Sequence, residues 1–248
     1  MNIKQKLTWA FAIIACLPVV LVATLVVMNL RSEARDRRVD SSGREIRQVS
    51  NAMQLFFDGI SQNVDYLASQ PLIKNTDDSL KTYMAANAES IPQGEMDKNV
   101  FAVLQDLGNS HPSYAYAIVG TAAGGYVSWP DDAKLNNYDP RQRPWYKAAQ
   151  AKPGKPFRTE AYYWAQDDAT YVSTVRTIDN KLGTNGGVVS IDVTLKQLTE
   201  IVKQIKLGET GYLMLLENTG TVLVDPKRPE HNFKALSSLG DGYAQLAK

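Results

Sequence analysis

Several residue types that carry chemistry are scarce in this chain of 248 residues. The single cysteine, Cys16, excludes an intramolecular disulfide. The two histidines, His111 and His231, are too few and too far apart for a metal site, which usually needs three or four ligands. The 27 basic and 26 acidic side chains leave a net charge of +1, which lacks the basic footprint of a nucleic-acid-binding domain. We therefore expect no metal, no cofactor and no nucleic-acid partner.

Motifs typical of catalysis are also absent. The sequence contains no Ser/His/Asp ordering, no Gly-rich phosphate loop and no CxxC pair, so we expect that the protein is not an enzyme. Hydrophobic residues make up 44% of the chain, which is enough for a core, and the length fits one or two domains.

Residues 7–30 carry no charge, and a run of about 24 apolar residues is long enough to span a bilayer. It is too long for the apolar part of a cleaved signal peptide and has no convincing cleavage site, so we expect an uncleaved transmembrane helix, with residues 1–30 forming a cytoplasmic tip and an anchor. The flanking charges do not support export of the residues after the run: Lys4 and Lys6 precede it, whereas four arginines lie beyond it between residues 31 and 38.

Residues 31–75 read as one long stalk helix that ends near Pro71. Its apolar residues recur every seven positions, which is typical of a coiled-coil seam, and we expect the first half to pair with a second copy while the second half lies on its own domain. The seam comprises Val39, Ile46, Met53, Ile60 and Leu67.

Beyond the stalk the pattern predicts an α+β fold of PAS-like form, an antiparallel sheet of about five strands with helices on one face. Residues 76–110 read as helical with an interruption at 91–94, and a linker helix follows the sheet at 195–207. The expected strands are 114–119, 126–129, 157–165, 170–178 and 187–193.

An internal repeat follows this module. Tyr212–Pro226 matches Tyr116–Pro130 at a constant offset of 96, and both copies read as an apolar strand, a Gly turn and a second apolar strand. We expect one module at 76–207 and the incomplete start of a second at 208–248.

The densest chemistry lies between Tyr138 and Tyr146. Two prolines fix this loop, and Arg143 with the indole of Trp145 could hold a carboxylate at the start of a helix. The alternative is that Trp145 and Tyr146 are ordinary core aromatics. Asp192 stands in the middle of an apolar strand, on the face opposite Ile191 and Val193, where a carboxylate could hold an ammonium group. Asp167 and Asp168 lie in a turn, where we expect them to be solvated.

The motif DPRxRPWYxxA at residues 139–149 resembles the signature of the double-Cache domain, the periplasmic sensor module of bacterial methyl-accepting chemotaxis proteins. The resemblance covers most of the chain. It implies a Cache fold, a membrane-distal ligand-binding module at 76–207, and an inner-membrane protein with residues from about 31 onward in the periplasm.

The resemblance also implies a binding site, because it extends to the amino-acid-binding members. Their carboxylate-holding residues fall on Arg143 and Trp145 and their ammonium-holding aspartate on Asp192, while Tyr138 and Tyr146 match their motif tyrosines. A further tyrosine is Tyr162 or Tyr163, and we take Tyr163 as the candidate. Some members carry an acidic residue two positions later, where this chain has Trp164 or Ala165.

The sequence thus predicts the sensor region of a homodimeric chemoreceptor that binds an L-amino acid. Four alternatives stay open: the same ectodomain on a sensor histidine kinase or a cyclic-dinucleotide enzyme, a site for amines or small organic acids, a membrane-anchored hydrolase, and a scaffold that only dimerises.

Overall fold

The computed structural model describes residues 3–76, 78–131, 135–179, 185–203, 211–217, 219–240 and 242–243. The chain divides into two compact units, residues 1–51 and residues 52–248. The described part of the first unit is helical and belongs to helix α1 (Ile3–Ser69). This helix ends as predicted, because Pro71 begins the short helix α2 (Pro71–Lys74) and Gln70 before it adopts extended backbone.

In the part of the chain that the structure describes, no helix combines the length and the hydropathy needed to cross a membrane. The side chains of residues 7–8 and 10–19, which belong to the predicted span at 7–30, lie outside the described part. The transmembrane helix is therefore not confirmed and stays a prediction.

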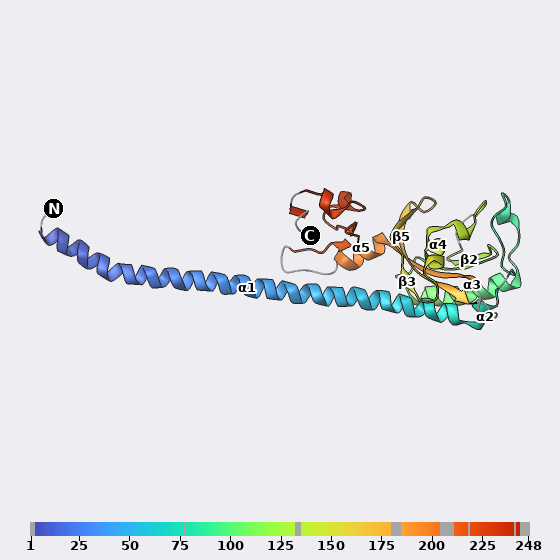
Figure 1. The fold of residues 1–248 in the computed structure, drawn as a ribbon, viewed down its shortest axis with the longest axis horizontal. Helices are drawn as coiled ribbons and strands as arrows, with labels where there is room; N and C mark the ends of the chain where they lie inside the picture. The colour runs from blue at the N-terminus through green and yellow to red at the C-terminus, as the bar shows by residue number, and fades with distance from the viewer. Residues whose placement is uncertain are drawn as a thin grey trace. The chain divides into compact units, whose positions relative to one another are not determined.

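Six antiparallel strands form the central sheet of the larger unit (Figure 1). Five follow the order β2-β1-β6-β5-β3, and β4 shares with β3 the free edge of β5. The order confirms the predicted antiparallel α+β class. The strands are β1 (Tyr116–Thr121), β2 (Tyr126–Trp129), β3 (Phe157–Arg158), β4 (Tyr162–Trp164), β5 (Ala169–Asp179) and β6 (Asn185–Thr194).

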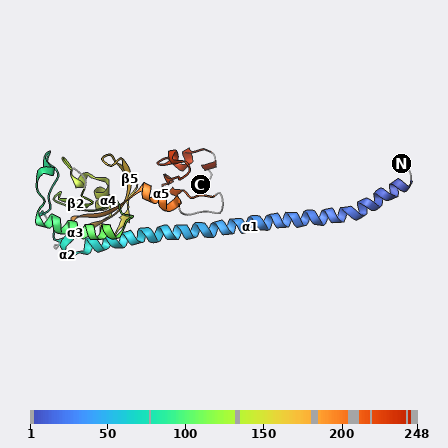
Figure 2. The ribbon, with the colours of Figure 1, turned by 180° about the vertical axis from the view of Figure 1, so that it is seen from behind.

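One face of the sheet packs on the end of α1 and on helix α3 (Glu95–Ser110), as Figure 2 shows from behind. From α1, Ile60, Val64 and Leu67 are buried in this layer, which agrees with the expectation that the second half of the stalk helix lies on its own domain. Gly108 of α3 is needed for the close approach, since a Cβ there would lie 2.0 Å from the Trp129 ring.

The opposite face carries a second core, so the prediction that helices cover one face only is wrong. Helix α4 (Pro144–Ala151) packs there through Trp145, Tyr146 and Ala149, against Ile118 and Val188 of the sheet. The alternation of strand side chains produces both cores, because successive residues point to opposite faces. The loop with the two prolines is thereby held over the sheet.

The helix predicted from residue 76 up to the interruption at 91–94 is also wrong. In the described part of this segment only a single 3₁₀ turn, Ala88–Ser90, is helical. The chain instead lies along the β1–β2 hairpin and the aromatic loop: Tyr126 donates its N–H to Lys81 O at 3.0 Å, and Tyr138 donates to Tyr83 O at 2.7 Å. These tertiary hydrogen bonds replace the helical ones that local propensity favoured.

The predicted strand 157–165 is divided into β3 and β4. Between them Ala161 donates its N–H to Glu217 Oε1 at 2.9 Å instead of to β5, which interrupts the pairing with that strand. Helix α5 (Leu195–Lys203) confirms the start of the predicted linker helix, whose last residues, 204–207, lie outside the described part.

The internal repeat is visible in the backbone. Gly124 and Gly220, 96 residues apart, both have positive φ, +91° and +81°, and each donates its N–H three residues back, to Thr121 and Glu217. The second hairpin consists of β7 (Leu215–Leu216) and β8 (Val222–Val224), followed by two 3₁₀ turns at Pro229–His231 and Leu236–Ser238. A complete second module is not shown.

Candidate functional site

The aromatic loop is built by its prolines and by one acidic cap. Pro140 begins a 3₁₀ turn (Pro140–Gln142), and Asp139 before it accepts the Arg141 N–H at 2.9 Å. The same carboxylate takes the Arg141 guanidinium through two hydrogen bonds of 2.9 Å, and this pairing lowers the pKa of Asp139. Arg141 thus braces the loop.

Pro144 then starts α4 and fixes where the next two aromatics go. Trp145 and Tyr146 are both buried, but they have different surroundings. Trp145 lines a pocket, whereas Tyr146 belongs to the core beneath it and does not line the pocket. Gly120 of β1 allows this packing, because a Cβ there would lie 2.8 Å from the Trp145 ring.

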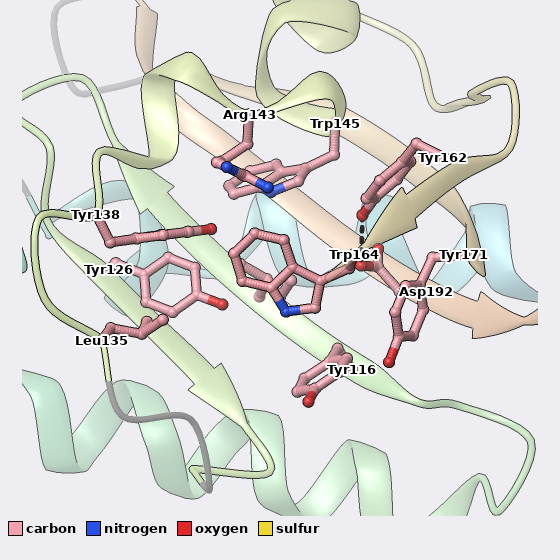
Figure 3. Close-up of a pocket in the computed structure, with 11 residues that line it drawn as sticks. Tyr116, Tyr126, Leu135, Tyr138, Arg143, Trp145, Tyr162, Trp164, Tyr171 and Asp192 are labelled. Atoms are coloured by element: carbon pink, nitrogen blue, oxygen red, sulfur yellow. Dashed lines mark hydrogen bonds between the residues drawn. The ribbon is translucent and has the colours of Figure 1, made fainter. Parts of the chain in front are cut away.

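The pocket lies between the sheet and this loop, and Figure 3 shows its side chains converging from both. Four of the six predicted site residues line it: Tyr138, Arg143, Trp145 and Asp192. The cavity they leave is small, about 30 Å³. The complete lining is Tyr116, Ile118, Tyr126, Leu135, Tyr138, Arg143, Trp145, Tyr162, Trp164, Tyr171 and Asp192.

Asp192 provides the anionic end of the pocket. It lies in the middle of β6 and is 3% exposed, while its neighbours Ile191 and Val193 point into the core on the α1 side. Ser190 Oγ donates to Asp192 Oδ1 at 2.5 Å and Tyr162 OH donates to Oδ2 at 3.0 Å. Burial raises the pKa of Asp192, although hydroxyl donors offset part of the shift. Among the described residues no cation pairs with this carboxylate.

Arg143 provides the cationic end, and it has aromatic rather than acidic neighbours. Its Cζ lies 4.1 Å from the ring centroid of Trp164 and 5.6 Å from that of Tyr138. None of the described carboxylates is within ion-pairing distance of its guanidinium, so its N–H groups can take an anionic ligand. Burial raises the pKa of Tyr138 to about 12 despite the nearby charge of Arg143, so that phenol is neutral at physiological pH.

The strand tyrosine that faces the pocket is Tyr162, and our choice of Tyr163 is wrong. Tyr163 is 58% exposed and donates its hydroxyl to Asp168 Oδ1 at 2.6 Å. Tyr162 lies on the other side of β4, with its hydroxyl shared between Ser173 Oγ and the Asp192 carboxylate at 3.0 Å. By the same alternation, the residue two positions on that enters the pocket is Trp164.

Sequence reasoning missed most of the aromatic lining. Strand alternation offered one signal, since Tyr116 and Ile118 share a face of β1. Cross-strand pairing offered a second, since Tyr171 of β5 lies opposite Tyr162 of β4. Asp167 is exposed, as we expected for this turn, and its Oδ2 also accepts the hydroxyls of Tyr116 and Tyr171, at 3.0 and 2.6 Å. It ties together one end of the pocket.

A Cache domain family model matches residues 32–245, which is most of the chain. The chain belongs to the Cache domain family. The resemblance seen in the DPRxRPWY motif is thereby confirmed.

Curated relatives of this Cache chain are chemotaxis receptors. The methyl-accepting chemotaxis protein McpB of Bacillus subtilis is 37% identical over 51% of this chain, and McpA of Pseudomonas putida is 30% identical over 67%. The aligned parts make up only 18% and 28% of these two relatives, so the chain matches a minor part of their length.

Solved structures similar to this Cache chain are ligand-binding domains of amino-acid chemoreceptors. The PctC domain of Pseudomonas aeruginosa in complex with GABA has a TM-score of 0.60 and 25% identity, covering 79% of both chains. The CtaA domain of Pseudomonas fluorescens with L-valine has a TM-score of 0.58 and 25% identity, covering 78% of this chain and 75% of that one. These relatives are receptors and not enzymes, in line with the lack of catalytic motifs.

Proposed function

We propose that this chain is the sensor region of a transmembrane chemoreceptor and that its pocket binds an L-amino acid. The observation that carries the proposal is that one pocket holds two opposite charges with no counter-charge among the described residues, the half-buried Arg143 and the buried Asp192. A buried charge costs several kcal/mol unless it is paired, and a zwitterion would pair both at once.

The roles follow from the donors and acceptors. Arg143 takes the ligand carboxylate with parallel N–H bonds, and the Trp145 indole N–H adds a neutral donor. Asp192 takes the ammonium group, and the hydroxyls of Ser190 and Tyr162 hold its carboxylate in position. Tyr138 shields the guanidinium from one side. Tyr146 supports Trp145 from the core, with ring centroids 5.5 Å apart, and has no ligand role.

Signalling would use the strand that holds Asp192. Its neighbours Ile191 and Val193 share a core with Ile60, Val64 and Leu67 of α1, so a ligand that shifts β6 acts on the helix through packed side chains. The shift of the equilibrium cannot exceed the difference in ligand affinity between the two states.

The remaining organisation belongs to the same proposal: residues 7–30 as the membrane anchor, residues 31–75 as a stalk that pairs two copies, and residues from about 31 onward in the periplasm. Residues 76–207 would be the membrane-distal module and 208–248 the start of a membrane-proximal one. The left-handed glycines repeated at 124 and 220 support the second module.

A thermal-shift screen tests the ligand class most simply. The purified 248-residue chain is heated with single amino acids, with polyamines and with organic acids. Because a ligand that binds only the folded state stabilises it, the melting temperature should rise with at least one L-amino acid. A rise with organic acids alone, or with amines alone, would contradict the zwitterion site.

A further inference from the structure

The indole of Trp164 is drawn in the middle of the ring of pocket side chains in Figure 3. Its ring centroid lies 4.1 Å from Arg143 Cζ. The indole is edge-on to Tyr138, with the two ring centroids 6.0 Å apart. It makes no hydrogen bond to any residue that the structure describes. Among the described residues, ring contacts and apolar packing against the second core hold it in place.

The pocket as it stands is too small for the proposed ligand. A cavity of about 30 Å³ has room for about two water molecules. The smallest amino acid has more non-hydrogen atoms than that, so part of the wall must move before the pocket can enclose an amino acid completely.

Most of the wall is fixed. Trp145 is 2% exposed and packed on the sheet, and the hydroxyls of Tyr116, Tyr162 and Tyr171 are tied to carboxylates. Trp164 is different on two counts: its indole has no hydrogen bond within the described chain, and it is the last residue of β4, directly before a turn.

We propose that Trp164 is the specificity-determining gate of this pocket. It covers Arg143 in the arrangement seen here, moves aside when a ligand carboxylate takes the guanidinium, and leaves room only for small ligand side chains. This inference rests on the proposed function, because it assumes that an amino acid binds between Arg143 and Asp192.

The test is calorimetric titration of the 248-residue chain and its variants with L-alanine, L-leucine and L-phenylalanine. The unchanged chain should prefer L-alanine. Trp164→Ala should raise the affinity for L-leucine and L-phenylalanine by about tenfold or more, which is the usual size of a steric discrimination. The affinity for L-alanine should change by less than about threefold. The affinities of Trp164→Phe for L-leucine and L-phenylalanine should lie between those of the unchanged chain and of Trp164→Ala.

Tyr163→Ala is the matched control, since Tyr163 is the neighbouring aromatic on the same strand but is exposed and outside the pocket. It should leave the affinity for all three amino acids unchanged. Circular dichroism confirms that each variant is folded. If Trp164→Ala does not fold, Trp164→Phe carries the test on its own, with a tightening for L-leucine of about threefold or more.

Two results would overturn the gate while leaving the proposed function intact. One is an equal loss of affinity for all three amino acids in Trp164→Ala, which would make Trp164 a platform that positions Arg143. The other is an unchanged chain that binds L-leucine as tightly as L-alanine. If no variant binds any amino acid, the proposed function fails instead.

Discussion

Replacing Arg143 by alanine tests the cationic end of the pocket against a control two residues away. Arg143 has no acidic partner among the described residues and lines the pocket, whereas Arg141 is paired with Asp139 outside it. In Arg143→Ala the ligand carboxylate would enter the pocket without its counter-charge. Truncating one partner of a buried charge pair typically costs about 2–5 kcal/mol.

That cost corresponds to an affinity loss of about 30-fold to several thousand-fold, at about 1.4 kcal/mol per decade. Arg141→Ala breaks an ion pair whose arginine side chain is 38% exposed, and such pairs contribute about 1 kcal/mol or less. Its effect on affinity should therefore stay within about fivefold.

The assay is calorimetric titration with an amino acid that raises the melting temperature of the unchanged chain. Both variants should remain folded. Among the described residues the Arg143 side chain makes ring contacts, worth about 0.5–2 kcal/mol, and the partly exposed Arg141 pair contributes about 1 kcal/mol or less. Equal losses in the two variants would show that the carboxylate is not held by Arg143, and the reasoning from unpaired charge would be refuted.

Three further predictions concern the rest of the site. Amino-acid affinity should fall as the pH drops through the raised pKa of Asp192, because the protonated acid cannot hold an ammonium. Since the folded state binds this proton more tightly than the unfolded chain, the same group should lower the free energy of unfolding as the pH rises through that pKa. Titrations with Asp192→Asn as reference should therefore show affinity falling and melting temperature rising as the pH is lowered. Tyr162→Phe should weaken binding by about three- to tenfold through loss of one hydrogen bond to Asp192, whereas Tyr163→Phe should leave it unchanged, and titration that finds the reverse would place the wrong tyrosine in the pocket. Gly120→Ala should weaken amino-acid binding in a chain that still folds, because the added Cβ would lie 2.8 Å from the Trp145 ring and would displace that donor. Normal affinity would show that Trp145 is not needed.

The sequence predicted the site better than its surroundings. Arg143, Trp145 and Asp192 were recognisable because each is a residue type out of place: a guanidinium and an indole in a rigid loop, and a carboxylate in an apolar strand. Strand period two and the two prolines then determine where these side chains point, and the structure brings them into one pocket.

What the sequence could not predict depends on contacts between distant segments. The choice between Tyr162 and Tyr163 follows from the register of β4 after its break at Ala161, which is made by a hydrogen bond to Glu217 far along the chain. Likewise, residues 76–90 were predicted to be helical, whereas hydrogen bonds to distant residues, among them Tyr126, Tyr138 and Asp97, hold the segment in a non-helical form. Local propensity carries no information on either point.

The central claim is that one ligand pairs with Arg143 and Asp192 together. Calorimetric titration of the 248-residue chain with L-alanine, ethylamine and propionate tests it most directly, because the three share a small side chain and differ only in their charged groups. We expect binding of L-alanine and an affinity at least about 30-fold weaker for each of the other two, since each leaves one charge of the pocket without its partner. Binding of ethylamine or propionate as tight as that of L-alanine would contradict it.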